Sequence, residues 1–171
     1  MRSSSLCLLL ALASCASVPA AVPSASATIA DAAGRPVARA EVRQAGAALA
    51  VHVEAAGLAP GAYGVHLHAV GRCEAPGFTS AGPHWNPTAR QHGRDNPAGM
   101  HMGDLPNLVV DARGRGTIDY RVEGGMLSAG ANALLDPDGA AVVVHAQPDD
   151  YRTDPSGNSG ARIACGVLAA A

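Results

Sequence analysis

Six of the seven histidines in this chain form an ordered array with one aspartate. Histidine is the commonest metal ligand among side chains. A set of imidazoles with one carboxylate and no thiolate suits Cu(II) and Zn(II) better than Cu(I) or an iron–sulfur cluster. Unrelated surface histidines are the alternative, but the number and order of these residues favour a metal centre. The array comprises His66, His68, His84, His92, His101, Asp104 and His145.

The first two histidines of the array lie in a run that alternates between apolar and polar residues, Ala62–Val70. His66 and His68 are two positions apart, and side chains at that spacing on a β-strand point to the same face. The run therefore predicts a strand that presents both imidazoles to one metal ion. The seventh histidine, His52, alternates with Glu54 on the polar side of another run, so we expect it to be exposed to solvent.

Short β-like runs separated by turn signals make up most of the remaining chain, and no window shows sustained helical periodicity. An Arg-Gly-Arg-Gly turn at residues 113–116 indicates a hairpin. We therefore expect an all-β fold, an antiparallel Greek-key β-sandwich or flattened barrel of about eight strands. The expected strands cover residues 27–31, 37–45, 47–54, 62–70, 105–111, 116–122, 141–146 and 161–168.

Two segments, residues 71–103 and 147–160, are too long and too rich in glycine and proline to be tight turns. Loops of this length in a compact domain are usually functional or disordered. The first segment holds Cys73 and three histidines of the array, so a metal ion and a disulfide would supply the order that its sequence lacks. We expect both segments to be functional loops.

Five segments of the chain resemble copper/zinc superoxide dismutases. The likeness runs in register from about Ala27 to Leu168, and the spacing of the array agrees with the family pattern at every position. The segments are Gly64-Val-His-Leu-His68, Thr79-Ser-Ala-Gly-Pro-His-Trp-Asn-Pro87, His101-Met-Gly-Asp-Leu-Pro-Asn107, Val144-His-Ala146 and Gly157-Asn-Ser-Gly-Ala-Arg-Ile-Ala-Cys-Gly-Val167.

The resemblance implies dismutation of superoxide to dioxygen and hydrogen peroxide by a copper centre that cycles between Cu(II) and Cu(I). Seven ligands serve two four-coordinate metals only if one ligand is shared, and the resemblance identifies His84 as the shared one. Zinc cannot change its oxidation state, so it would hold the bridging histidine. The implied copper ligands are His66, His68, His84 and His145. The implied zinc ligands are His84, His92, His101 and Asp104.

Two further residues match functional positions of the family. Asp149 matches an aspartate that links a copper-ligand histidine to a zinc-ligand histidine, and such carboxylates orient imidazoles. Arg162 matches a cavity arginine that meets the anion, so His84 and Arg162 are the expected catalytic residues. The alternatives are a solvated aspartate in an acidic loop and an ordinary arginine at the start of a strand.

The first residues carry the features of a secretory signal. Basic Arg2 precedes an apolar run, Leu6–Ala13, that is too short to cross a bilayer. Leu12-Ala-Ser-Cys15 resembles a bacterial lipobox, in which the cysteine becomes the lipidated first residue. We expect residues 1–15 to be a signal peptide, residues 16–27 an Ala/Ser/Pro-rich tether and residues 28–171 the folded domain, located in the periplasm. Cleavage near Ala27, with release of a soluble protein, is the alternative.

Cysteine usage and net charge limit the covalent structure and the partners. The formal net charge is −2 and all twelve basic residues are arginine, so no nucleic-acid partner is indicated. Superoxide is the expected partner, and a homodimer remains open because the subunit contact differs between bacterial and animal members. Cys73 and Cys165 remain after the leader, and two cysteines in an exported domain most simply form one disulfide. Two buried free thiols are the alternative.

The main functional alternative is a non-catalytic periplasmic protein that binds copper and zinc without turnover. Such a relative would be expected to lose part of the copper set or the cavity arginine. All four implied copper ligands and Arg162 are present. The sequence therefore favours the enzyme.

Overall fold

The computed structural model describes residues 22–171. The expected signal peptide and Cys15 lie outside these residues. The described residues form antiparallel strands and one short 3-10 helix, with no α-helix among them. No helix in this part of the chain has the length and hydrophobicity to cross a membrane. The elements are β1 (Ser24–Asp31), β2 (Pro36–Gln44), β3 (Ala48–Ala55), β4 (Gly61–Tyr63), β5 (Val65–His68), η1 (Thr79–Ala81), β6 (Leu108–Val110), β7 (Thr117–Glu123), β8 (Ala141–His145), β9 (Arg162–Val167) and β10 (Ala169–Ala170).

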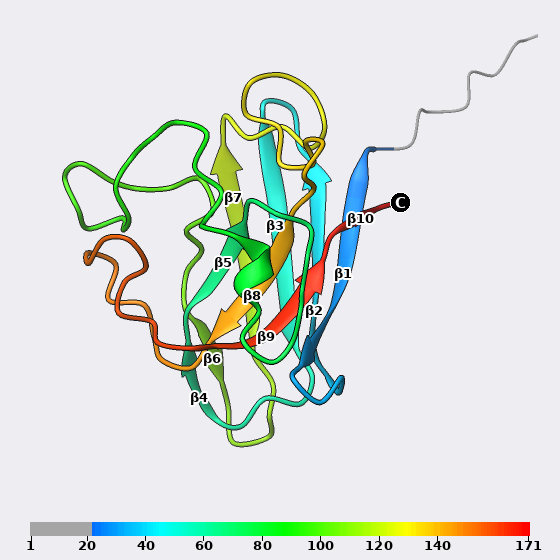
Figure 1. Cartoon of the computed structure of the whole chain (residues 1–171), viewed down its shortest axis with the longest axis vertical. Coiled ribbons are helices and arrows are strands. Elements are labelled where there is room, and N and C mark those ends of the chain that lie inside the picture. The colour runs from blue at the N-terminus through cyan, green and yellow to red at the C-terminus, as the bar shows by residue number, and fades with distance from the viewer. Residues whose placement is uncertain (1–21) are drawn as a thin grey trace, which may run out of the picture.

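The strands form a curled sheet that folds over its own core. The strand order is β5-β8-β9-β1-β2-β3-β7, with β10 beside β1, and β4 pairs with β6 in a small separate sheet. Three neighbouring pairs, β5–β8, β9–β1 and β3–β7, are not consecutive in sequence, which is the crossover pattern of a Greek key. In Figure 1, β5, β8 and β9 cross in front of β2, β3 and β7. The predicted all-β antiparallel fold is confirmed.

The main core lies between these two layers and is built from alternate residues of each strand. On β3, Leu49, Val51 and Val53 are buried. On β5, Val65 and Leu67 point to the same core and pair in register with strand β8. Burying a Val or Leu side chain contributes roughly 1.5–3 kcal/mol, so these strands hold the layers together without many aromatic residues.

The opposite face of β5 and β8 carries the histidines. His66 and His68 alternate with the core residues of β5 and lie beside Val143 and Ala141 of β8. A second, smaller apolar cluster covers this face and places segment 71–103 over it. It comprises Phe78, Ala81, Ala141, Val143 and Cys165. The same period-two alternation therefore builds both the core and the wall of the metal centre.

The predicted disulfide between Cys73 and Cys165 is present and confirmed. It joins residues 92 positions apart, with a Cα–Cα distance of 5.6 Å, and so ties segment 71–103 to β9.

Three strands differ by three or more residues from the expected boundaries, and one of them, at residues 105–111, is shortened to β6 (Leu108–Val110). The run at residues 62–70 is divided at Gly64, where the loop after β8 approaches the backbone: a Cβ on Gly64 would lie 2.9 Å from the Cβ of Ser159. The Gly64 amide donates a hydrogen bond to the carbonyl of Gln147 at 2.8 Å. The break at Gly64 therefore lets β4 pair with β6 while β5 stays in the main sheet.

The folded domain begins before residue 28, inside the expected tether. Residues Ser24–Ala27 belong to β1 and pair with β2 on one side and β10 on the other. Ala25 and Ala27 are buried in the main core. The Ser-Ala alternation is therefore the start of a strand, because pairing on both sides outweighs the weak β-propensity of these small residues.

Candidate metal centre

Four histidines converge beside β5, and we call them the four-histidine group: His66, His68, His84 and His145. Two come from β5 and one from the end of β8. His84 follows η1 and forms an isolated bridge with His68. All four side chains are buried, and their candidate ligand atoms lie within 4.8 Å of one another.

Five buried imidazole nitrogens lack a hydrogen-bond partner among residues 22–171. Four of them are one nitrogen from each member of the four-histidine group: Nδ1 of His66 and Nε2 of His68, His84 and His145. The fifth is Nδ1 of His92. Buried polar atoms are normally hydrogen-bonded. Unpaired imidazole nitrogens that converge in this way fit a bound Cu(II) or Zn(II) ion.

Hydrogen bonds fix the opposite ring nitrogens of two of these histidines. Nδ1 of His68 donates to the carbonyl of Gly82 at 2.9 Å, and Nδ1 of His145 donates to the carbonyl of Gly160 at 3.3 Å. Bonds of this kind set the tautomer and orientation of a ligand imidazole. These two hydrogen bonds leave the free lone pair of each ring on Nε2, which faces the four-histidine group.

A second group, the aspartate group, surrounds Asp104 and contains His84, His92 and His101. Oδ1 of Asp104 lies 2.9 Å, 3.0 Å and 3.2 Å from the Nδ1 atoms of these three histidines, respectively. The Nδ1 atoms of His84 and His101 are 3.3 Å apart. Ligand atoms around tetrahedral zinc, at about 2.0–2.1 Å from the ion, lie about 3.3 Å from one another. The aspartate group therefore has the dimensions of a zinc site.

The distances between ligand atoms also allow an alternative set of four ligands, in which His66 takes the place of His101 beside His84, His92 and Asp104. We prefer His101 for chemical reasons. Nε2 of His66 is occupied by a hydrogen bond with Asp149, and its Nδ1 faces the four-histidine group. His101 instead points Nδ1 at Asp104 and at His84.

His84 belongs to both groups. Its Nδ1 lies 2.9 Å from Asp104, while its Nε2 is the unpaired nitrogen that the four-histidine group shares. An imidazole with one nitrogen in each group can hold two metal ions at once. Two flanking cations favour loss of its second proton.

Burial keeps the four-histidine group neutral. Desolvation lowers the pKa of His66 to about 3, of His68 to about 2 and of His145 to about 4. It lowers the pKa of His84 as well. Neutral imidazole is the form that binds metal, so the protein prepares these side chains as ligands near neutral pH.

The aspartate group is arranged for a cation. Burial alone would raise the pKa of Asp104, but hydrogen bonds with His101 and His84 and the nearby His92 imidazole outweigh it and hold that pKa well below its usual range. Burial would likewise lower the pKa of His92, yet Asp104 and Asp149 raise it to about 9. Without metal, a proton on His92 thus offsets the negative charge of Asp104. A bound zinc ion would replace that proton.

Asp149 connects the two groups from outside. Its Oδ2 lies 2.9 Å from Nε2 of His66 and its Oδ1 lies 3.0 Å from Nε2 of His92. The side chain of Asn107 holds the Asp149 backbone through two hydrogen bonds, at 2.7 and 2.9 Å. Hydrogen bonds from the two histidines outweigh burial and lower the pKa of Asp149. Its charged carboxylate can therefore orient both rings.

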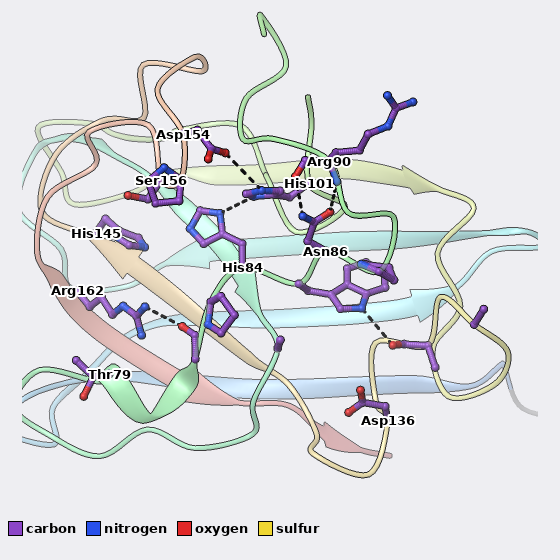
Figure 2. A pocket seen from close by; sticks show the side chains of 18 of the residues that line it. Thr79, His84, Asn86, Arg90, His101, Asp136, His145, Asp154, Ser156 and Arg162 are labelled. Carbon is purple, nitrogen blue, oxygen red and sulfur yellow. Dashed lines mark hydrogen bonds and ion pairs between the residues drawn. The ribbon is translucent and has the colours of Figure 1, made fainter. Parts of the chain in front are cut away.

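A cavity of about 870 Å³ opens onto the two groups. Figure 2 shows His84, His145 and Arg162 along one side of it. Arg162 donates hydrogen bonds to the carbonyl of Phe78 at 2.8 Å and to that of Gly82 at 2.7 Å. Burial lowers the pKa of Arg162, but guanidinium remains protonated in proteins. The cavity thus offers a fixed cation beside the four-histidine group.

Sequence reasoning missed a third loop at the cavity. Residues 124–140, between β7 and β8, contribute Ala131, Ala133 and Asp136 to its lining. Trp85, beside the shared histidine, donates a hydrogen bond to the carbonyl of Ala133 at 3.1 Å. A Pro-Asp-Gly turn near the end of this loop was the available signal, but it does not reveal the long-range contact.

The seventh histidine, His52, lies away from both groups. It is partly exposed, and its Nδ1 is 2.7 Å from Asp119.

A Greek-key β-sandwich that carries a group of four imidazoles beside a group of imidazoles and one carboxylate has the architecture of a metalloprotein. The family model for copper/zinc superoxide dismutase (SODC) matches residues 37–168. The chain belongs to the copper/zinc superoxide dismutase family, and its cofactors are copper and zinc.

Individual relatives agree on the family and differ in how their activity is described. The superoxide dismutase-like protein YojM of Bacillus subtilis is 48% identical over 122 residues, which cover 70% of this chain and 62% of that protein. The chain thus spans less than two thirds of that relative. The Cu-Zn superoxide dismutase 1 of Aquifex aeolicus is 40% identical over 137 residues, 79% of this chain and 81% of the relative. A crystal structure of a SOD-like protein from Bacillus subtilis has a TM-score of 0.77 at 40% identity, covering 84% of this chain and 97% of that chain.

Proposed function

We propose that this protein is an active superoxide dismutase that converts superoxide to dioxygen and hydrogen peroxide. The observation that carries the proposal is the position of His84, with Nδ1 in the aspartate group and Nε2 in the four-histidine group. We assign copper to the four-histidine group, His66, His68, His84 and His145. We assign structural zinc to the aspartate group, His84, His92, His101 and Asp104. A site with four protein ligands is typical of structural zinc.

Copper, when bound, supplies the electron transfer by cycling between Cu(II) and Cu(I). The protein brings the substrate to it. Arg162 attracts the anion and orients it, because its guanidinium is a permanent cation at the cavity wall. The carbonyls of Phe78 and Gly82 hold that guanidinium in place.

Proton transfer is assigned to His84. Its Nε2 would hold one proton in half of the cycle and donate it to the peroxide product, whose second proton would come from solvent, while Nδ1 would stay in the aspartate group. Asp149 keeps the rings of His66 and His92 oriented, so that both groups retain their shape around the shared histidine.

The second candidate function is binding of copper and zinc without turnover. It is favoured by the likeness to proteins described as superoxide dismutase-like. The presence of the complete four-histidine group together with Arg162 supports the enzyme instead. Metal binding alone would not need a cation in the cavity.

Metal content and activity, measured together on purified protein, separate the two candidates. We expect one copper and one zinc per chain and conversion of superoxide to peroxide faster than its spontaneous dismutation. As a matched control, His145→Ala should lose copper and activity and keep zinc. A protein that carries both metals and does not remove superoxide faster than its spontaneous dismutation would support the binding function and overturn the enzyme.

We further propose that the protein is exported and held at a membrane by a lipid on Cys15. Support comes from β1: cleavage near Ala27 would remove Ser24–Ala27, which pair with β2 and β10. In Figure 1 the start of β1 lies on the opposite side of the molecule from loop 147–160. An anchor before β1 would therefore leave the metal centre facing away from its attachment point.

A further inference from the structure

The loop after β8 brings a second carboxylate to the aspartate group. Oδ1 of Asp154 accepts a hydrogen bond from the backbone amide of His92 at 2.6 Å. The same oxygen lies 3.9 Å from Nε2 of His101. Figure 2 shows Asp154 directly beside His101 at the rim of the cavity. One carboxylate thus faces two members of the aspartate group from a segment more than fifty positions away in the chain.

The position of Asp154 complements that of Asp149. In both His92 and His101, Nδ1 faces Asp104, so Nε2 is the outer nitrogen. Asp149 accepts from the outer nitrogen of His92. The outer nitrogen of His101 has Asp154 as its nearby carboxylate among the described residues. Metal-bound imidazoles almost always donate their outer N–H to a carboxylate, a carbonyl or water.

We propose that Asp154 is a positioning residue for zinc, which orients His101 and fixes the backbone of His92. The inference rests on the zinc assignment given under the proposed function. At 3.9 Å the contact with His101 is too long for a direct hydrogen bond and has the length of one bridged by water. The side chain of Asp154 is 49% exposed, so solvent screens its charge. We therefore expect about a tenfold effect on zinc retention, the lower end of the range for such outer partners.

Two substitutions separate the two contacts of Asp154. Asp154→Asn keeps an oxygen that can accept from the His92 amide and removes the negative charge that faces His101. Asp154→Ala removes both. The matched control is Asp95→Asn, which makes the same charge change on a carboxylate that is 47% exposed and whose closest charged partner is Arg94, at 3.9 Å.

The measurement is the rate of zinc release from the holoprotein to a chelator, together with the optical spectrum of protein carrying cobalt in place of zinc. We expect release to be about tenfold faster in Asp154→Asn, faster still in Asp154→Ala, and unchanged in Asp95→Asn. The cobalt spectrum should change in both Asp154 variants and stay constant in the control. Thermal unfolding of metal-free Asp154→Asn should match wild type, because this variant keeps an acceptor for the His92 amide.

These outcomes separate the inference from the enzyme proposal. If both Asp154 variants release zinc at the rate of Asp95→Asn and their cobalt spectra are unchanged, the positioning role is overturned even if the enzyme is active. If the wild-type protein has no dismutase activity and the Asp154 variants still release zinc faster, the positioning role is supported and the enzyme proposal is overturned. A wild-type protein that holds no zinc would overturn both.

Discussion

Arg162 and His68 donate hydrogen bonds to the same oxygen, the backbone carbonyl of Gly82, at 2.7 and 2.9 Å. The guanidinium and the imidazole are therefore fixed relative to one another by a single peptide group. That peptide precedes Pro83 and His84, so the turn that delivers the shared histidine also sets the distance between the cavity cation and the four-histidine group.

Arg162→Glu should sharply lower the second-order rate of superoxide removal while metal content stays unchanged. Electrostatic guidance raises association rates by about 10- to 1000-fold, so we expect at least a tenfold loss at low salt. Wild-type activity should fall as salt increases, because exposed charges are screened beyond about 10 Å at 0.1 M. Arg152→Glu, the same charge change in loop 147–160, is the control and should have a much smaller effect. An Arg162→Glu variant as fast as wild type at low salt would remove this residue from the mechanism.

His84→Ala should disturb both metals, whereas Asp104→Ala should weaken zinc first. His84 contributes one nitrogen to each group, so its loss removes a ligand from both and also removes the assigned proton donor. Asp104 belongs to the aspartate group alone. The measurements are metal content, the copper absorption and magnetic resonance spectra, and dismutase activity. Wild-type activity with an unchanged copper spectrum in His84→Ala would contradict the shared position.

The sequence predicted the parts of this centre that follow from local pattern or from family motifs. His66 and His68 share a face because a strand alternates, and Asp149 follows from its place after His145. Contacts that depend on loop conformation were not predictable. Asp154 reaches His92 only because loop 147–160 folds onto segment 71–103, for example where a Cβ on Gly93 would collide with the backbone of the second loop.

The start of the domain was misplaced for a related physical reason. Ser24–Ala27 has the composition of a tether, and only its pairing with β2 and β10 makes it a strand. The break at Gly64 likewise depends on the approach of Ser159 from a distant loop. Local propensity describes such segments poorly, because tertiary pairing decides their conformation.

Cys73→Ser should destabilise the protein and lower its activity. The disulfide closes a separation of 92 residues, which corresponds to about 4–5 kcal/mol in the chain-entropy model, an upper-end figure. It also holds the segment whose carbonyls, at Phe78 and Gly82, bind Arg162. Unfolding by denaturant with metals bound, beside the activity at a fixed metal content, tests both effects. Intact-mass thiol labelling of the purified wild-type protein should find neither Cys73 nor Cys165 free; two labelled thiols would contradict the pairing.

The metal-free protein should lose stability as the pH falls below about 6.5. Burial lowers the pKa of His66, His68 and His145 from 6.5 to between about 2 and about 4. Between those values the unfolded chain binds more protons than the folded one, so the free energy of unfolding decreases as pH falls. His92, with its pKa raised to about 9, acts in the opposite sense and loses its contribution between pH 6.5 and 9. Denaturant unfolding of the metal-free protein at pH 5, 6.5 and 8.5 should therefore show a maximum near 6.5; equal stability at all three would contradict the buried neutral state.

Cys15→Ser should shift the protein from the membrane fraction to the soluble periplasm, because the substitution removes the proposed site of lipidation. Eight residues separate Cys15 from β1, and fully extended they span at most about 29 Å, so an anchored domain would stay close to the membrane. Cell fractionation and mass analysis of the N-terminus test the proposal. Ser14→Ala, a change beside the cysteine, is the control and should leave the protein in the membrane fraction. A wild-type N-terminus at Thr28 would rule out the anchor. Such a cut would also remove the buried Ala25 and Ala27 from β1, so we expect a chain cut there to be less stable than the anchored one.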